Sequence, residues 1–187
     1  MNGATFETAT ERRTTRRLVL LATDTSATSA SAERAGVELA ARIGANLILL
    51  SVIDPSRLRL PGGVFHTRVD QVRTERESAL ARIVEDARKH GVSALFLIWE
   101  GDPGAVVIEA AEAEGADVIV VGSHARGPVG RLLLGSVSAY VVAHAPGPVL
   151  VIRPGQKLDD VWPLVARNGA NTAPIAGLAA ARRPASP

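Results

Sequence analysis

Cysteine is absent from the sequence, and aromatic residues make up only 3% of it. Without cysteine the chain has no disulfide framework, no thiol nucleophile and no cysteine-based zinc site. Because aromatic rings are scarce, valine, leucine, isoleucine and alanine must build the core, which suits parallel strands buried on both faces. No apolar run approaches the roughly 20 residues of a membrane-spanning helix. The polar residues 1–15 also lack the apolar centre of a signal peptide, so we expect a cytoplasmic protein with no membrane partner.

Net charge is also small, because 21 basic and 19 acidic residues leave a formal charge of +2. The 47% of hydrophobic and 21% of charged residues are typical of a globular protein, and 187 residues suffice for one domain. Short arginine clusters lie near the two chain ends, at residues 12–17 and 182–183. A nucleic-acid footprint needs a larger basic face. We therefore interpret these clusters as solvated tails and expect no nucleic-acid partner.

Apolar runs of strand length alternate with stretches of helical periodicity. The predicted strands are residues 18–22, 47–53, 94–99, 118–121 and 148–152. The predicted helices cover residues 32–43, 69–90, 103–114 and 136–144. This alternation predicts an α/β fold, a three-layer sandwich around an open, five-stranded, parallel, Rossmann-like sheet.

The two ends of the chain lack such periodicity. We expect residues 1–15 to be a disordered N-terminal tail and residues 155–187 to be a mostly disordered C-terminal tail, with Trp162 as a docking point. The predicted single domain is therefore residues 16–154.

The loop after the fourth predicted strand, residues 122–135, is rich in glycine and leads to a helix near Ser136. Glycines let backbone N–H groups approach an anion, and the helix N-terminus adds its positive end. Arg126 and Arg131 can add charge, while the hydroxyls of Ser136 and Ser138 can cap the helix or donate to phosphate oxygens. The loop lacks the P-loop and dinucleotide-binding glycine patterns. It indicates a phosphate site, or alternatively a long turn in which Ser136 is only the N-cap.

Several separate segments resemble the universal stress protein family. They are residues 22–26, 49–55, 121–124, 134–138 and 148–154. The resemblance spans residues 16–154 and keeps the same order of elements. It implies a sandwich of the adenine nucleotide alpha hydrolase type that binds ATP, with Mg²⁺ held through the phosphates rather than by protein ligands.

The ATP-binding members of that family carry a signature of glycine, two residues, glycine, nine residues, and then glycine with serine or threonine. Gly122, Gly135 and Ser136 match this signature, but Ala125 stands at the middle glycine position. If that position requires a positive φ or close contact with phosphate, the methyl group of Ala125 costs about 1 kcal/mol. Gly127, two residues later, is an alternative if the loop is shifted.

The resemblance also implies a role for each site residue. Ala22, Thr23 and Asp24 would line the adenine and ribose side, and Val52 would offer backbone groups to the adenine edge. The residues that would surround the ribose and phosphates are Val121, Gly122, Ala125, Arg126, Gly127, Gly135, Ser136, Val137 and Ser138. The residues alone also allow Asp24 to be a helix-capping aspartate and Val52 to be an ordinary strand residue.

We expect a nucleotide-binding module in stress response or signalling, in which the ligand biases conformation or the choice of an unidentified protein partner. The sequence shows no nucleophile elbow, triad or metal-ligand spacing, so at most weak ATP hydrolysis is expected. The alternatives are an interaction module without a nucleotide, a cyclic-AMP-binding variant, or an ATP-hydrolysing or adenylating enzyme. The resemblance further implies a homodimer through the strand at residues 148–152, which would lie at a sheet edge.

Overall fold

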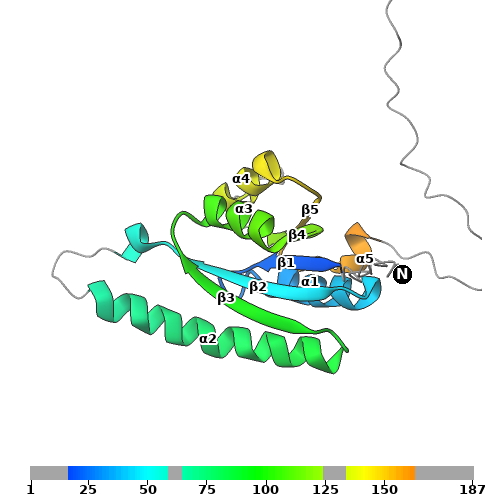
Figure 1. Ribbon diagram of the computed structural model, residues 1–187, viewed down its shortest axis with the longest axis horizontal. Helices are drawn as coiled ribbons and strands as arrows, with labels where there is room; N and C mark the ends of the chain where they lie inside the picture. The colour runs from blue at the N-terminus through cyan, green and yellow to red at the C-terminus, as the bar shows by residue number, and fades with distance from the viewer. Residues whose placement is uncertain (1–16, 59–64, 124–133, 163–187) are drawn as a thin grey trace, which may run out of the picture.

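The computed structural model describes residues 17–58, 65–123 and 134–162 (Figure 1). Five parallel strands form one sheet in the order β3-β2-β1-β4-β5. The strands are β1 (Leu18–Ala22), β2 (Asn46–Ile53), β3 (Ala94–Glu100), β4 (Val118–Gly122) and β5 (Val149–Ile152). The predicted α/β fold with a Rossmann-like parallel sheet is confirmed.

The helices connect the strands as expected from the alternating pattern. They are α1 (Ala30–Ile43), α2 (Phe65–Lys89), α3 (Pro103–Glu114), α4 (Ser136–His144) and α5 (Leu158–Val161), with a 3₁₀ helix η1 (Pro55–Leu58). Gly44 and Gly115 end α1 and α3 in the left-handed region, with φ of 65° and 67°. The Asp102 carboxylate caps α3 by accepting a 3.0 Å hydrogen bond from the amide of Ala105. Helix α2 begins at Phe65, earlier than the predicted residue 69.

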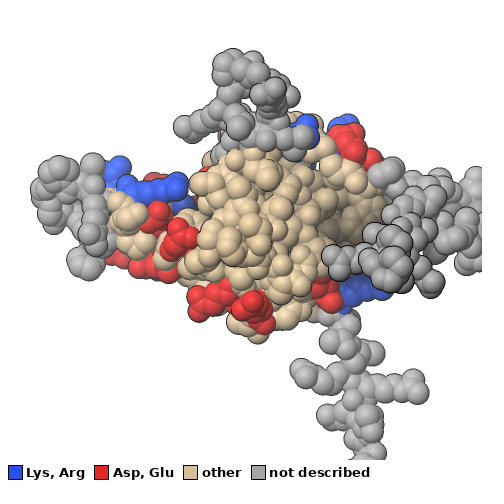
Figure 2. All heavy atoms as spheres, turned by 90° about the horizontal axis from the view of Figure 1, so that it is seen from above, with Lys and Arg blue, Asp and Glu red and all other residues tan. Residues whose placement is uncertain are grey.

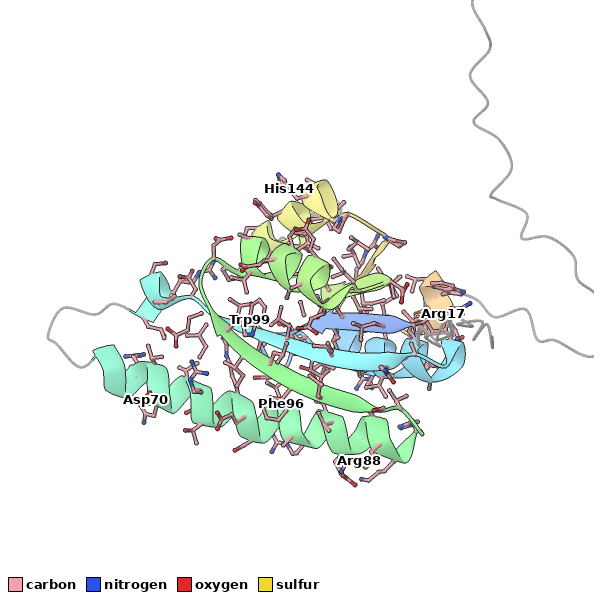
Figure 3. The ribbon with its side chains drawn as sticks, in the orientation of Figure 1. Arg17, Asp70, Arg88, Phe96, Trp99 and His144 are labelled. Carbon is pink, nitrogen blue, oxygen red and sulfur yellow. The ribbon has the colours of Figure 1, made fainter. Side chains whose placement is uncertain are left out.

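Each face of the sheet is covered by its own helices (Figure 1). On one face, α1, α2 and α5 pack on β-strand residues such as Leu21 and Leu49. On the other face, α3 and α4 pack on residues such as Leu20 and Leu50. Figure 3 shows Phe96 of β3 on the α2 side, where it packs against the first cluster. Since neighbouring strand residues point to opposite faces, β1 and β2 contribute to both layers of core.

The face formed by α3 and α4 carries few charges in the view of Figure 2. Helix α4 contains no lysine, arginine, aspartate or glutamate, and Tyr140 and Val142 are 40% and 47% exposed on it. Tyr140 stacks on His144, with 4.0 Å between the ring centroids. Among the described residues, no helix has the length and hydropathy needed to span a bilayer.

The folded part of the chain continues beyond residue 154, into the stretch that was expected to be a tail. The amide of Gly155 donates to the Ser31 hydroxyl at 2.8 Å, and Arg42 of α1 pairs with Asp159 at 2.7 Å. Leu158 is 1% exposed and belongs to the core cluster under α1. Trp162, the expected docking residue, is 45% exposed. Leu158 therefore attaches this segment, because it is the side chain that enters the core.

Candidate functional site

The strand order reverses at the centre of the sheet, because β1 has β2 on one side and β4 on the other. In open parallel sheets, a crevice forms at such a reversal outside the carboxyl ends of the strands. A cavity of about 540 Å³ lies at this place, within the range of roughly 300–1,000 Å³ typical of small-molecule sites. Its walls come from the ends of β1, β2 and β4, together with η1, α2, α3 and the start of α4.

Most of the residues predicted for the site line this cavity. They are Ala22, Thr23, Asp24, Val52, Val121, Gly122, Gly135, Ser136, Val137 and Ser138. The three other predicted residues, Ala125, Arg126 and Gly127, lie outside the described residues, as do His124 and Arg131. The structure therefore brings together the ends of three strands and the start of α4, which lie up to about a hundred residues apart in the chain.

Asp24 is held by the turn that joins β1 to α1. Its Oδ1 accepts hydrogen bonds from the Ser29 hydroxyl at 2.6 Å and from the Ser26 amide at 3.0 Å. Ser29 is the N-cap of α1, so Asp24 is not itself the capping residue. Thr25 has a φ of 57°, a left-handed conformation that is uncommon for a residue other than glycine. The turn fixes the Asp24 carboxylate at the cavity wall.

Behind this turn, Thr23 connects the site to a half-buried carboxyl group on α1. The Thr23 hydroxyl donates to Oε1 of Glu33 at 2.6 Å and accepts from the Thr25 amide at 2.9 Å. Burial raises the pKa of Glu33, and the hydrogen bond from Thr23 opposes that rise only in part. The nearby charge of Asp24 raises the pKa further. Protonation of Glu33 is therefore easier in the folded protein than in water.

The end of β2 presents backbone groups to the cavity. The last residue of β1, Ala22, pairs with Leu50, and the Thr23 amide donates to the Leu50 carbonyl at 2.9 Å. The Ile53 carbonyl, in contrast, accepts from Gly101 on the β3 side at 3.0 Å. Because the carbonyls of a strand alternate in direction, the Val52 carbonyl points past the end of β1 into the site.

Arg76 of α2 contacts that carbonyl, and the sequence reasoning did not identify it. Its Nη1 donates to the Val52 carbonyl oxygen at 2.5 Å and to the Ser51 hydroxyl at 3.0 Å. Burial lowers the pKa of Arg76, while the charge of Asp24 opposes this. Arg76 lies one turn before Leu80, which is buried against the sheet, so helical periodicity was a usable signal for the direction of its side chain. The residue of β2 that it contacts becomes visible only in the structure.

The opposite wall is formed by the end of β4 and the first turn of α4. Gly135 is the N-cap of α4 and has an extended conformation, so Ser136 is the first helical residue rather than the cap. The first N–H groups of a helix have no intrahelical partner, and those of Ser136 and Val137 belong to cavity-lining residues. The buried Ser138 hydroxyl donates to the Gly135 carbonyl at 3.0 Å. Ser138 thus supports the first turn of α4 in this structure.

The rim beside β2 carries an ion pair that the sequence reasoning did not assign to the site. Asp54 and Arg57 both line the cavity, and Arg57 Nε lies 3.0 Å from Asp54 Oδ2. The Ser56 hydroxyl lowers the pKa of Asp54, and the Ser56 amide and the charge of Arg57 add to this. The position of Asp54 directly after a predicted strand could have identified it as a candidate site residue.

In the described ranges, no group of three or more histidine, aspartate or glutamate side chains is arranged to hold a metal.

A doubly wound parallel sheet with a cavity at its reversal point places this chain among the Rossmann-like α/β proteins. The model of the universal stress protein family matches residues 15–153. The chain belongs to the universal stress protein family.

Individual relatives agree with this assignment. A universal stress protein of Methanocaldococcus jannaschii is 30% identical over 141 residues, which cover 74% of this chain and 83% of the relative. The solved structure of UspA from Lactobacillus plantarum has a TM-score of 0.66 at 28% identity, covering 73% and 97% of the two chains. A universal stress protein from Archaeoglobus fulgidus, solved in complex with dAMP, has a TM-score of 0.55 at 22% identity, covering 74% and 98%. At that identity, the last similarity shows the fold alone.

Proposed function

We propose that the cavity binds ATP, with Mg²⁺ carried by the phosphates, and that occupancy biases the conformation or partner choice of a stress-response protein. The observation that carries this proposal is the facing arrangement of three polar features around one cavity. These are the Asp24 carboxylate, the backbone of Val52 and the N-terminus of α4. A nucleotide has a complementary order of groups, with a hydroxyl-bearing ribose between a base and an anionic chain.

The wall at α4 suits the phosphates. Gly122 and Gly135 place no side chain between the backbone and the cavity, so an anion can approach the amide groups closely. The α4 N-terminus adds roughly half a positive charge at the same place. No cluster of protein carboxylates is needed for Mg²⁺, because this ion usually binds through substrate phosphates and retains several waters.

The opposite wall suits a ribose and a base. Asp24 is exposed and fixed by Ser29, so its carboxylate can accept hydrogen bonds from ribose hydroxyl groups. Val72 and Pro103 line the cavity and are partly exposed, so they supply apolar surface for the faces of a base. We propose a binding role with at most weak hydrolysis, in a cytoplasmic protein.

We further propose that two copies of the chain associate through residues 148–152. Strand β5 is at the end of the sheet order, so one of its edges has no neighbour within the described sheet. Val149, Leu150 and Val151 are only partly buried. Unpaired edges of this kind favour pairing with a second copy.

Isothermal titration of the full chain with ATP and Mg²⁺ tests the nucleotide proposal. We compare Ser136→Asp with Val142→Asp, since both add one negative charge to α4 but only Ser136 lines the cavity. Repulsion of phosphate should lower the affinity of Ser136→Asp at least about tenfold, while Val142→Asp should bind as the wild type does. A flat trace for the wild type would favour an interaction module without nucleotide. Stronger competition by cyclic AMP than by ATP would favour the cyclic nucleotide.

A further inference from the structure

We infer that Arg76 is a specificity-determining residue, which lowers the preference of the cavity for a 6-amino purine over a 6-oxo purine. The inference rests on the proposed nucleotide site and concerns its base end. Arg76 lines the cavity from α2, and its guanidinium contacts the backbone oxygen of Val52. A ligand that uses this oxygen must share it with Arg76 or displace Arg76.

The Val52 carbonyl is suited to recognise the edge of a base. It lies two residues beyond Leu50, the last residue of β2 that pairs with β1, and it points to the side where β1 has ended. A carbonyl oxygen only accepts hydrogen bonds, so it can bind the amino group at C6 of adenine. It cannot accept anything from an oxygen at C6, because both atoms are acceptors.

The position of Arg76 is fixed by several groups. The buried Ser51 hydroxyl donates to the Thr23 carbonyl at 2.8 Å, so its oxygen accepts from Nη1 of Arg76 at 3.0 Å. The nearby negative charge of Asp24 favours the guanidinium in this place. The Ser51 hydroxyl and the negative charge of Asp24 therefore both hold Arg76 against the Val52 carbonyl.

The chemistry of the two purine types then leads to opposite effects. An amino group at C6 competes with Arg76 for the Val52 oxygen, and the two donors repel each other. An oxygen at C6 can accept a hydrogen bond from the guanidinium, which carries five N–H donors. Arg76 thus disfavours the amino form and favours the oxo form.

ATP and ITP provide the direct comparison, because they differ only along one edge of the base. ATP has an amino group at C6 and an unprotonated N1, whereas ITP has an oxygen at C6 and an N1–H. The ratio of their affinities cancels every contact with ribose, phosphate and Mg²⁺. In the full chain, Arg76→Met should raise the preference for ATP over ITP by about tenfold, the effect of one hydrogen bond of roughly 1.4 kcal/mol. Arg73→Met is the matched control, since Arg73 lies one turn earlier and pairs with Glu100 at 2.6 Å without lining the cavity. Its ratio should equal that of the wild type.

A second variant tests the same contact without changing the arginine. Ser51→Ala removes the hydroxyl that holds Arg76 and should shift the ratio in the same direction, by about threefold. Thermal unfolding of each variant shows that it is folded. An unchanged ratio in both Arg76→Met and Ser51→Ala overturns the inference while leaving the proposed function intact. A wild-type protein that binds neither triphosphate overturns both.

Discussion

The hydroxyl of Ser29 donates a 2.6 Å hydrogen bond to Oδ1 of Asp24, joining the start of α1 to the second residue after the end of β1. The same oxygen accepts from the Ser26 amide at 3.0 Å. A carboxylate with two fixed donors is more restricted in its rotamer than a solvated one, and such preorganisation reduces the entropy lost on binding. The turn therefore preorganises the Asp24 carboxylate for the ligand proposed above.

This relationship makes Ser29→Ala a test of the site. Loss of one donor should lower the affinity for ATP by about two- to tenfold, as expected for a single hydrogen bond. Ser26→Ala is the control, because it preserves the backbone amide that donates to Asp24 and, of the contacts of the Ser29 hydroxyl, removes only a long, 3.4 Å contact with the Ser26 hydroxyl. Calorimetric titration of both variants measures the difference. Equal affinities would show that orientation of Asp24 by Ser29 does not contribute to binding.

Two glycines at element ends should respond differently to alanine. A Cβ at Gly104 would lie 2.8 Å from Cδ1 and 3.1 Å from Cβ of Tyr140, whereas at Gly122 the nearest atom is Cβ of Ala32 at 3.6 Å. Gly104→Ala should therefore destabilise the protein by about 1–3 kcal/mol through overpacking between α3 and α4. Gly122→Ala should change the free energy of unfolding by less than about 0.5 kcal/mol. Urea denaturation measures both values, and the reverse order would contradict this packing.

The segment after β5 provides a further prediction. Because Leu158 is 1% exposed in the core under α1, Leu158→Ala should lower the free energy of unfolding by about 2–3 kcal/mol. Trp162→Ala removes a larger side chain that is 45% exposed and should cost less than about 1 kcal/mol. Chemical denaturation of the two variants compares them. A larger effect at Trp162 would assign the anchoring role to that residue after all.

Glu33 should make stability depend on pH. Its pKa is raised in the folded protein above the ordinary value of 4.5, so folding favours the neutral carboxyl group. The resulting stabilisation is complete below the unfolded pKa and is lost as the pH rises through the folded pKa. Glu33→Gln stays neutral and its amide oxygen can still accept from Thr23. This variant should therefore be more stable than the wild type near neutral pH. The difference in the free energy of unfolding between the two proteins should shrink as the pH falls.

Urea midpoints measured from acid to neutral pH test this expectation. Glu109→Gln on α3 is the control for the loss of one negative charge, since Glu109 is an exposed glutamate on the other face of the sheet. If the difference in stability between Glu33→Gln and the wild type stays constant over the whole range, or grows as the pH falls, the pKa of Glu33 is not raised in the folded state.

The sequence predicts the sheet well because its signals are local. The apolar run at residues 18–22 coincides with β1, and Gly44 and Gly115 mark helix ends through their left-handed conformations. The cavity residues at the ends of β1 and β4 could also be predicted, because parallel strands end at one edge of a sheet. Such reasoning needs only the order of the elements.

Contacts between distant elements were not predictable in the same way. The contact of Arg76 with Val52 depends on the register of α2 against β2, which no short pattern encodes. Leu158 is one leucine in an otherwise polar stretch, so only its burial against α1 distinguishes it. Ser138 was considered as a phosphate donor, but its hydroxyl donates to Gly135 within the same turn.

The walls of the cavity come from segments between Ala22 and Ser138 that meet only when β1 has inserted between β2 and β4. A chain that has not completed this insertion lacks the binding surface. Any ligand of the cavity therefore binds the folded protein and not its partly folded forms. At a free concentration 100 times its dissociation constant, such a ligand adds about 2.7 kcal/mol to the free energy of unfolding. The lifetime of this protein in the cell would then follow the supply of its own ligand.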